Sequence, residues 1–94
     1  MDKRSINDVI KEVAQKAKDV NFGTIDSKVL SDFIMVANLK GLDVGVVFLK
    51  GKRNDNNRAA INILVEAAEK LKQLSYLDTE TIAYTVGHLP AVLD

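Results

Sequence analysis

The side chains with the clearest capacity for chemistry are four basic residues within nine positions, Lys50, Lys52, Arg53 and Arg58. Asp55 is the only acidic residue among them, so this stretch carries a net charge of +3. A helix that starts just behind such a loop adds free N–H groups and its dipole to the attraction for an anion. These four residues are therefore our candidate anion or nucleic-acid contact, although a solvated loop beside the start of a helix is the interpretation that we favour.

The same loop contains a run of residue types that bind calcium, Asn54–Asn57. An EF-hand loop that opened at Asp55 would need a glycine at its sixth position and a glutamate at its twelfth. Ala60 and Glu66 stand there, so the glutamate is present but the glycine and a third carboxylate-type ligand are missing. We interpret the run as capping of the following helix and predict no metal site.

Catalytic chemistry has few candidates in this composition. The chain contains no cysteine and one histidine, His88, which excludes a thiolate metal site and a cysteine nucleophile. The five glycines are scattered, so no phosphate-binding loop is present. His88 follows the last expected helix, where its imidazole can hydrogen-bond the final carbonyls. We predict no catalytic residue, no cofactor and no enzyme activity.

Composition places the chain among small globular proteins. Its 94 residues are 47% hydrophobic and 28% charged, which predicts one folded domain over residues 1–94. Thirteen basic residues balance thirteen acidic ones, which argues against a DNA-coating protein. The charge is uneven, because residues 59–94 carry a net charge of −3. No apolar run suits a membrane span or a signal peptide, so we expect a cytoplasmic protein without membrane contact.

Capping residues and apolar spacing predict the helices that position these groups. Ser5 and Asp8 form a short capping box at the start of a first helix. The apolar residues of this helix recur at helical spacing as far as Val20. Asp26 is the expected N-cap of a second helix, which ends at Gly41.

Two further helices are expected after the basic loop. The segment 57–74 is apolar over more than half of its helical circumference, which predicts a central helix packed on two sides. Asp78 is the expected N-cap of a last helix at about 79–86. Gly87 ends this helix in our interpretation, and Pro90 blocks its continuation.

The segment 44–50 has two interpretations. Val46–Phe48 favour a strand and Gly45 is unfavourable in a helix, but a lone strand has no neighbour to pair with. In the other interpretation Asp43 caps a short buried helix that Gly51 ends. We predict an all-α fold, a small orthogonal bundle of about five helices. An α+β fold with a short strand at 44–50 is the alternative.

The segment 30–53 resembles a helix-turn-helix in its spacing. The motif requires a small residue, a glycine, an apolar residue, a capping residue and a second apolar residue at fixed spacing. The residues at these positions are, in that order, Ala37, Gly41, Leu42, Asp43 and Val47. The expected outward positions of the second helix hold Val44, Gly45, Phe48 and Leu49. Because polar side chains read base edges, we favour a packing role for this unit over DNA recognition.

The second helix has more apolar residues than its core-facing side needs. Met35, Val36 and Leu39 point away from that side, and they are close in sequence to the apolar run at 44–49. We predict that a second subunit covers this apolar surface. The alternative is that the run at 44–49 folds back and buries all three residues.

These features together predict a small non-enzymatic protein-interaction module of the adaptor or regulator type. It is expected to be a homo-oligomer, and the sequence does not identify a partner protein. The alternative is a small DNA-binding regulator that uses a degenerate helix-turn-helix at residues 30–53, so nucleic acid is a less favoured partner.

Overall fold

The computed structural model describes residues 4–93, so Asp94, one of the acidic residues in the segment 59–94, lies outside the described residues. The described chain contains a short 3₁₀ helix and five α-helices: α1 (Ile6–Lys16), η1 (Phe22–Thr24), α2 (Ser27–Lys40), α3 (Leu42–Gly51), α4 (Arg58–Lys72) and α5 (Thr79–Leu93). It contains no strand between residues 4 and 93. The all-α prediction is confirmed, and the strand alternative at 44–50 is wrong.

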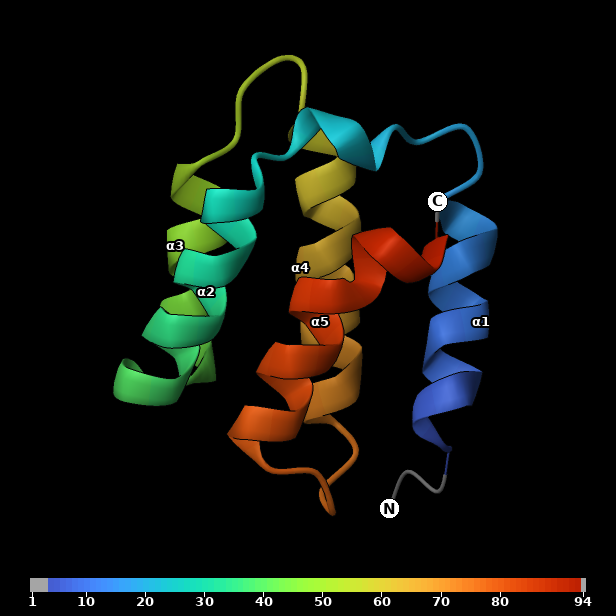
Figure 1. The fold of residues 1–94 in the computed structure, drawn as a ribbon. Coiled ribbons are helices and arrows are strands. Elements are labelled where there is room, and N and C mark those ends of the chain that lie inside the picture. The colour runs from blue at the N-terminus through green and yellow to red at the C-terminus, as the bar shows by residue number, and fades with distance from the viewer. Residues whose placement is uncertain (1–3, 94) are drawn as a thin grey trace.

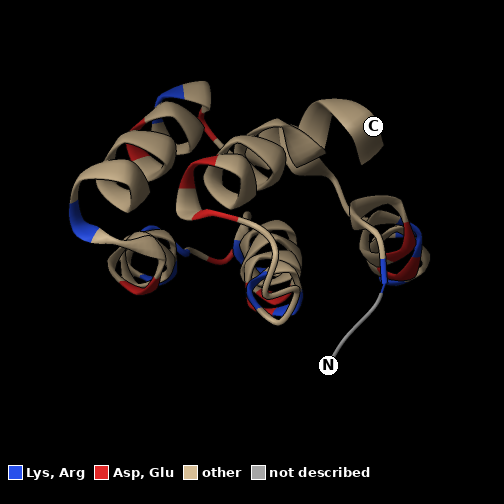
Figure 2. Ribbon diagram, turned by 90° about the horizontal axis from the view of Figure 1, so that it is seen from below, with Lys and Arg blue, Asp and Glu red and all other residues tan. Residues whose placement is uncertain are grey.

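The helices form two packed layers. Successive helices run in alternating directions (Figure 1). In the view along the helices, α2 and α5 form one layer and α3, α4 and α1 form the other (Figure 2). α2 packs mainly against α3 and α5, while α4 contacts α1, α3 and α5. The molecule measures 36 × 30 × 17 Å, and its shortest dimension fits two helical layers whose axes are ~8–10 Å apart.

Helix α4 is the central helix, as its broad apolar arc predicts. Seven of its residues are buried: Ala60, Ile61, Leu64, Val65, Ala67, Ala68 and Leu71. Asn57 occupies the N-cap position and is itself buried, at 6% exposure. Because these side chains face three neighbouring helices, α4 supplies the surface on which the other elements assemble.

Helix α1 begins as predicted but ends earlier. Ser5 and Asp8 form the expected capping box, and the backbone hydrogen bond from Ser5 lowers the pKa of the Asp8 carboxyl. The helix ends at Lys16, whereas the apolar spacing predicted helix as far as Val20. Asp19 takes a positive φ of 66°, and this turn redirects the chain so that buried Phe22 reaches the core.

Charged side chains link α1 to α4 outside the apolar contact of Val9 and Val13. Glu12 accepts hydrogen bonds from Arg4 and Lys70, and the bond from Lys70 lowers the pKa of its carboxyl. These ion pairs are partly exposed, so they contribute little to stability. Buried Val9 and Val13 therefore hold α1 in place.

A single residue, Gly41, connects α2 to α3. It ends α2 as predicted and has a φ of +104°, which side chains rarely tolerate. The prediction that Asp43 caps α3 is wrong, because α3 begins at Leu42 and has no side-chain cap. A Cβ added at Gly45 would lie 2.9 Å from the Cβ of Ala37, so α2 and α3 approach each other closely there.

Helix α5 differs from the prediction at its C-terminal end. Asp78 caps its start, where its Oδ1 accepts a hydrogen bond of 2.8 Å from the Thr81 N–H. The helix then continues through Gly87 and Pro90 to Leu93. A Cβ at Gly87 would lie 2.4 Å from Cδ1 of Ile34, so this glycine allows a close helix contact and does not end the helix.

Pro90 is accommodated inside α5 by a change in helix direction. A proline removes one backbone hydrogen bond and its ring clashes with the carbonyl four residues earlier, which bends a helix. The ribbon of α5 turns in its C-terminal part (Figure 1). Both Leu89 and Pro90 are buried after the bend. Burial of this segment favours continued helix over the predicted end at residue 86.

We expect the substitutions Leu64→Ala and Leu71→Ala each to lower the free energy of unfolding by about 2–5 kcal/mol, because each leaves a cavity in the core. The two side chains are 0% and 1% exposed. Urea denaturation measures the loss, with exposed Glu69→Ala on the same helix as the control. A loss below about 1 kcal/mol for both leucines would show that α4 is not the central helix.

We expect Gly45→Ala and Gly51→Ala to have opposite effects on stability. The new methyl at position 45 meets Ala37 and Phe33, and overpacking of this kind costs about 1–3 kcal/mol. Nothing lies within 4 Å of a Cβ at Gly51, so only the helix propensity of alanine acts there, a gain of up to about 1 kcal/mol. Equal changes in thermal unfolding temperature for the two variants would contradict the close approach of α2 and α3.

Candidate interaction site

Helices α2 and α3 expose most of the large apolar side chains on the described surface. Four of the seven such residues belong to them: Met35, Leu39, Val44 and Val47. We call these four the outer apolar face. Met35 is 54% exposed and Leu39 is 75% exposed, so the alternative that residues 44–49 bury them is wrong. Val36, the third residue of the predicted interaction surface, is half-buried.

The rotation of α3 about its own axis decides which of its residues reach the surface. Gly45 and Leu49, which we expected to point outward, are buried. Val47, which the helix-turn-helix pattern assigned to packing, is 66% exposed. The close contact of Gly45 with Ala37 fixes this rotation, because only the glycine side of α3 can approach α2 so closely.

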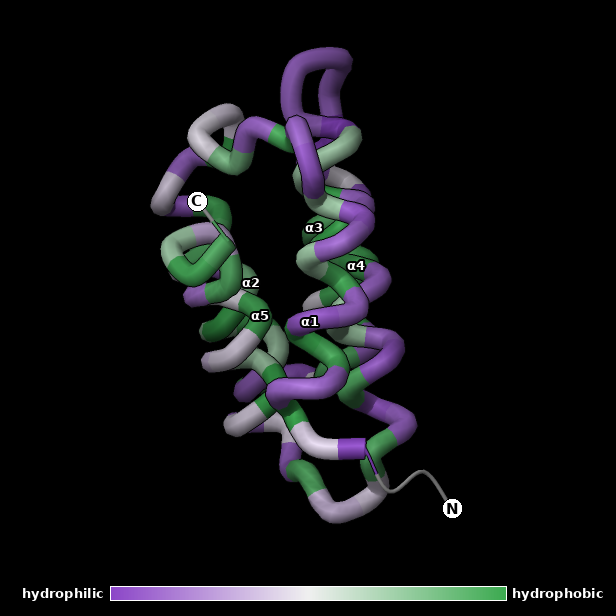
Figure 3. Tube along the Cα trace, turned by 90° about the vertical axis from the view of Figure 1, so that its right-hand side faces the viewer, coloured by the Kyte–Doolittle hydropathy of each residue, from purple (hydrophilic) through white to green (hydrophobic). Residues whose placement is uncertain are grey.

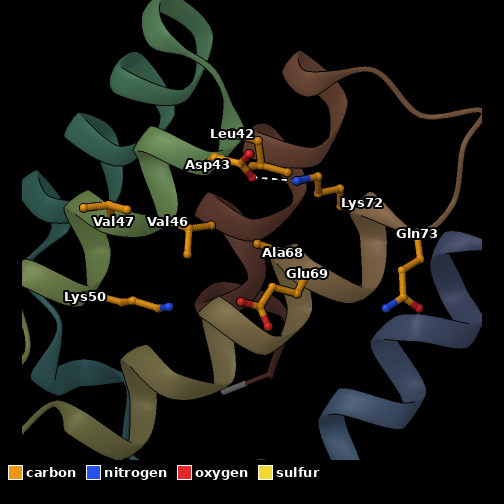
Figure 4. Close-up of a pocket in the computed structure, with 9 residues that line it drawn as sticks. All are labelled: Leu42, Asp43, Val46, Val47, Lys50, Ala68, Glu69, Lys72 and Gln73. Carbon is orange, nitrogen blue, oxygen red and sulfur yellow. Dashed lines mark hydrogen bonds and ion pairs between the residues drawn. The ribbon is translucent and has the colours of Figure 1, made fainter.

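A groove of about 510 Å³ lies between α3 and α4, beside the outer apolar face (Figure 4). Its floor includes Val46 and Ala68, which are 8% and 0% exposed. Val47 lines the groove and also belongs to the outer apolar face. The apolar surface of α3 therefore continues from the exterior into the groove.

Four charged side chains surround this floor. Helix α3 contributes Asp43 and Lys50, and helix α4 contributes Glu69 and Lys72. Lys72 Nζ and Asp43 Oδ1 form an ion pair of 2.6 Å across the groove. Lys50 and Glu69 point toward each other from opposite walls (Figure 4), but no ion pair joins them among residues 4–93. An apolar floor with charges of both signs around it suits the side chains of a protein surface.

The sequence contains a signal for these charges that we did not use. Asp43 and Lys50 are seven positions apart on one helix, and Glu69 and Lys72 are three apart on another. Both spacings place the two members on one side of their helix. Only the packing of α3 beside α4 makes these two sides face each other.

The structure does not bring the four predicted anion-binding residues together. Lys50 extends into the groove, and Lys52 lies over the Phe48 ring at 5.3 Å from its centroid. Arg53 donates from Nη1 to Asn62 Oδ1 at 3.0 Å and from Nε to the Lys50 carbonyl. Arg58 pairs with Asp55 at 3.7 Å. Lys52, Arg53 and Arg58 therefore have separate partners, and Lys50 points into the groove.

The asparagines of the loop hold one another in place. Asn54 Oδ1 accepts from the N–H groups of Asn56 and Asn57. Asn57 accepts from the Asn54 N–H and donates from Nδ2 to the Lys52 carbonyl. Asn57 occupies the N-cap of α4 without a side-chain bond to the helix, so the asparagines close the loop in place of the predicted side-chain cap. Within residues 4–93, no cluster of three or more histidine and carboxylate side chains is placed for a metal.

His88 lies within α5, not beyond its end as predicted. Its Nδ1 is 2.8 Å from the Tyr84 carbonyl one turn earlier. The two rings stack with their centroids 4.1 Å apart. His88 therefore makes a local contact on the helix surface.

Comparison of the chain with protein-family models, with curated proteins and with solved structures gives no match. None of the helices between residues 4 and 93 has the length and apolar character needed to cross a membrane.

We expect reversal of the basic loop, Lys52→Glu with Arg53→Glu, to change neither DNA retention nor stability appreciably. The loop side chains are exposed, so the stability change should stay within about 1 kcal/mol. The effect on DNA binding is measured as the retention of duplex DNA by the wild type and by the double variant, at ~0.15 M salt and at lower salt. Salt-dependent retention that the wild type shows and the double variant loses would contradict this prediction.

Proposed function

We propose that the protein is a non-enzymatic interaction module that associates with other protein surfaces, including its own copies, through α2 and α3. The observation that carries this proposal is the outer apolar face, which gathers most of the large exposed apolar side chains of the described surface. Apolar residues scattered singly over a surface are ordinary, but their concentration on two adjacent helices is typical of a contact surface.

The connection between the two helices brings part of the outer apolar face to one end of the pair. Leu39 and Val44 flank the one-residue turn at Gly41, so both lie at the end where α2 joins α3. On α2, Met35 and Leu39 are four positions apart and share one side of the helix. The tube in Figure 3 is hydrophilic along the loop between α3 and α4, whereas hydrophobic segments occur along the helices.

The DNA-binding alternative has no specific observation in its favour. The large exposed apolar residues of α3 are Val44 and Val47, and their side chains offer no hydrogen-bond donor or acceptor to base edges. Asp43 in the first turn of α3 would be repelled by phosphate.

We expect the wild type to self-associate and Met35→Lys and Leu39→Lys each to weaken this association at least about tenfold, because a lysine in an apolar contact loses its hydration. Sedimentation over a range of concentrations measures the change. Val92→Lys is the matched control, since Val92 is 62% exposed but lies on α5. A wild type that stays monomeric at high concentration would contradict self-association, and equal weakening by Val92→Lys would contradict the assignment of the surface.

A further inference from the structure

We infer that the α3–α4 groove is a two-fold contact between copies of this chain, in which the α3 wall of each copy meets the α4 wall of the other. This inference rests on the proposed function and identifies a second copy as the occupant of the groove. It is carried by the order of the charges on the two walls.

The two walls have opposite charges at corresponding levels. Asp43 on α3 faces Lys72 on α4, and further along the groove Lys50 on α3 faces Glu69 on α4 (Figure 4). Within one chain, Asp43 Oδ1 and Lys72 Nζ form an ion pair of 2.6 Å. The second pair has no ion pair within the described chain, so a partner's charges have direct access to it.

A two-fold axis that runs along the groove exchanges its walls. The α3 wall of one copy then lies over the α4 wall of its partner, at the same level along the axis. Lys50 of each copy meets a Glu69 of the other, and Asp43 meets Lys72 in the same way. Every charge therefore faces an opposite charge, which is the requirement for a self-complementary surface.

The apolar residues between these charges fit the same arrangement. Helices α3 and α4 run in opposite directions (Figure 1). Two copies would bring four such helices together around Val46, Val47 and Ala68. Val47 is 66% exposed in the single chain and would be covered. Burial of the apolar residues supplies affinity, while the charges at the rim select the partner and its register.

A charge exchange between two variants tests this arrangement. Lys50→Glu alone places like charges against Glu69 twice in each dimer, and Glu69→Lys alone does the same against Lys50. We expect each variant to dimerise at least about tenfold more weakly than the wild type. Both positions are exposed, so the fold should be retained, as circular dichroism would verify.

An equimolar mixture of the two variants restores both contacts between chains, although each chain keeps its own internal repulsion. We therefore expect a heterodimer of near wild-type affinity. Native mass spectrometry with one variant isotope-labelled, together with sedimentation, detects it. The matched control is an equimolar mixture of the variants Lys11→Glu and Glu80→Lys. Both residues are exposed and lie outside the groove, so these changes should leave association unchanged.

The possible outcomes separate this inference from the proposed function. A mixture that forms no heterodimer, or single variants that dimerise like the wild type, would overturn the two-fold groove contact. If Met35→Lys still weakens association in that case, the proposed function stands without the groove. A wild type that is monomeric at every concentration would overturn both the groove contact and self-association.

Discussion

The close approach of α3 to α2 at Gly45 is the contact on which the accessible surface of this protein depends. A Cβ at that position would lie 3.1 Å from Cε1 of Phe33 as well as touching Ala37, so no larger residue fits without movement. The contact sets the rotation of α3, and that rotation turns Leu49 into the core and Val47 outward. The exposure of Val47 and one wall of the groove follow from this one steric fit.

Two glycines on neighbouring helices allow close packing against α2. Gly45 lets α3 approach one side, and Gly87 lets α5 approach the other side near Ile34. With two close neighbours, α2 has its core-facing side filled by Phe33 and Ala37. Its remaining apolar residues, among them Met35 and Leu39, are left at the surface. An interaction surface on α2 is therefore a consequence of tight packing elsewhere on the same helix.

Apolar and charged groups have separate roles in the contact that we propose. The apolar residues of the groove, Val46, Val47 and Ala68, provide the area whose burial favours association. The charges around the groove contribute little energy while they are exposed, but they penalise a partner whose charges do not match. A small domain with a formal net charge of zero can in this way discriminate between partners by the arrangement of its charges.

The sequence by itself determined the helices that depend on local interactions. The capping residues Ser5, Asp26 and Asp78 all occupy the predicted positions, because an N-cap requires only a few neighbouring residues. The central position of α4 was also predictable, since its apolar arc is wider than one neighbouring helix can cover.

Only the tertiary structure decided the features that depend on a distant neighbour. Gly87 and Pro90 indicate a helix end when they are considered locally, yet the close contact with Ile34 and the burial of Pro90 continue α5 to Leu93. The basic loop suggested one anion site, but its side chains found separate partners such as Asn62 and Phe48. The groove joins residues of two helices that are far apart in the sequence, and neither helix alone contains the pairing of charges across it. Long-range packing fixes the relative position of such groups, and no local pattern in the chain encodes it.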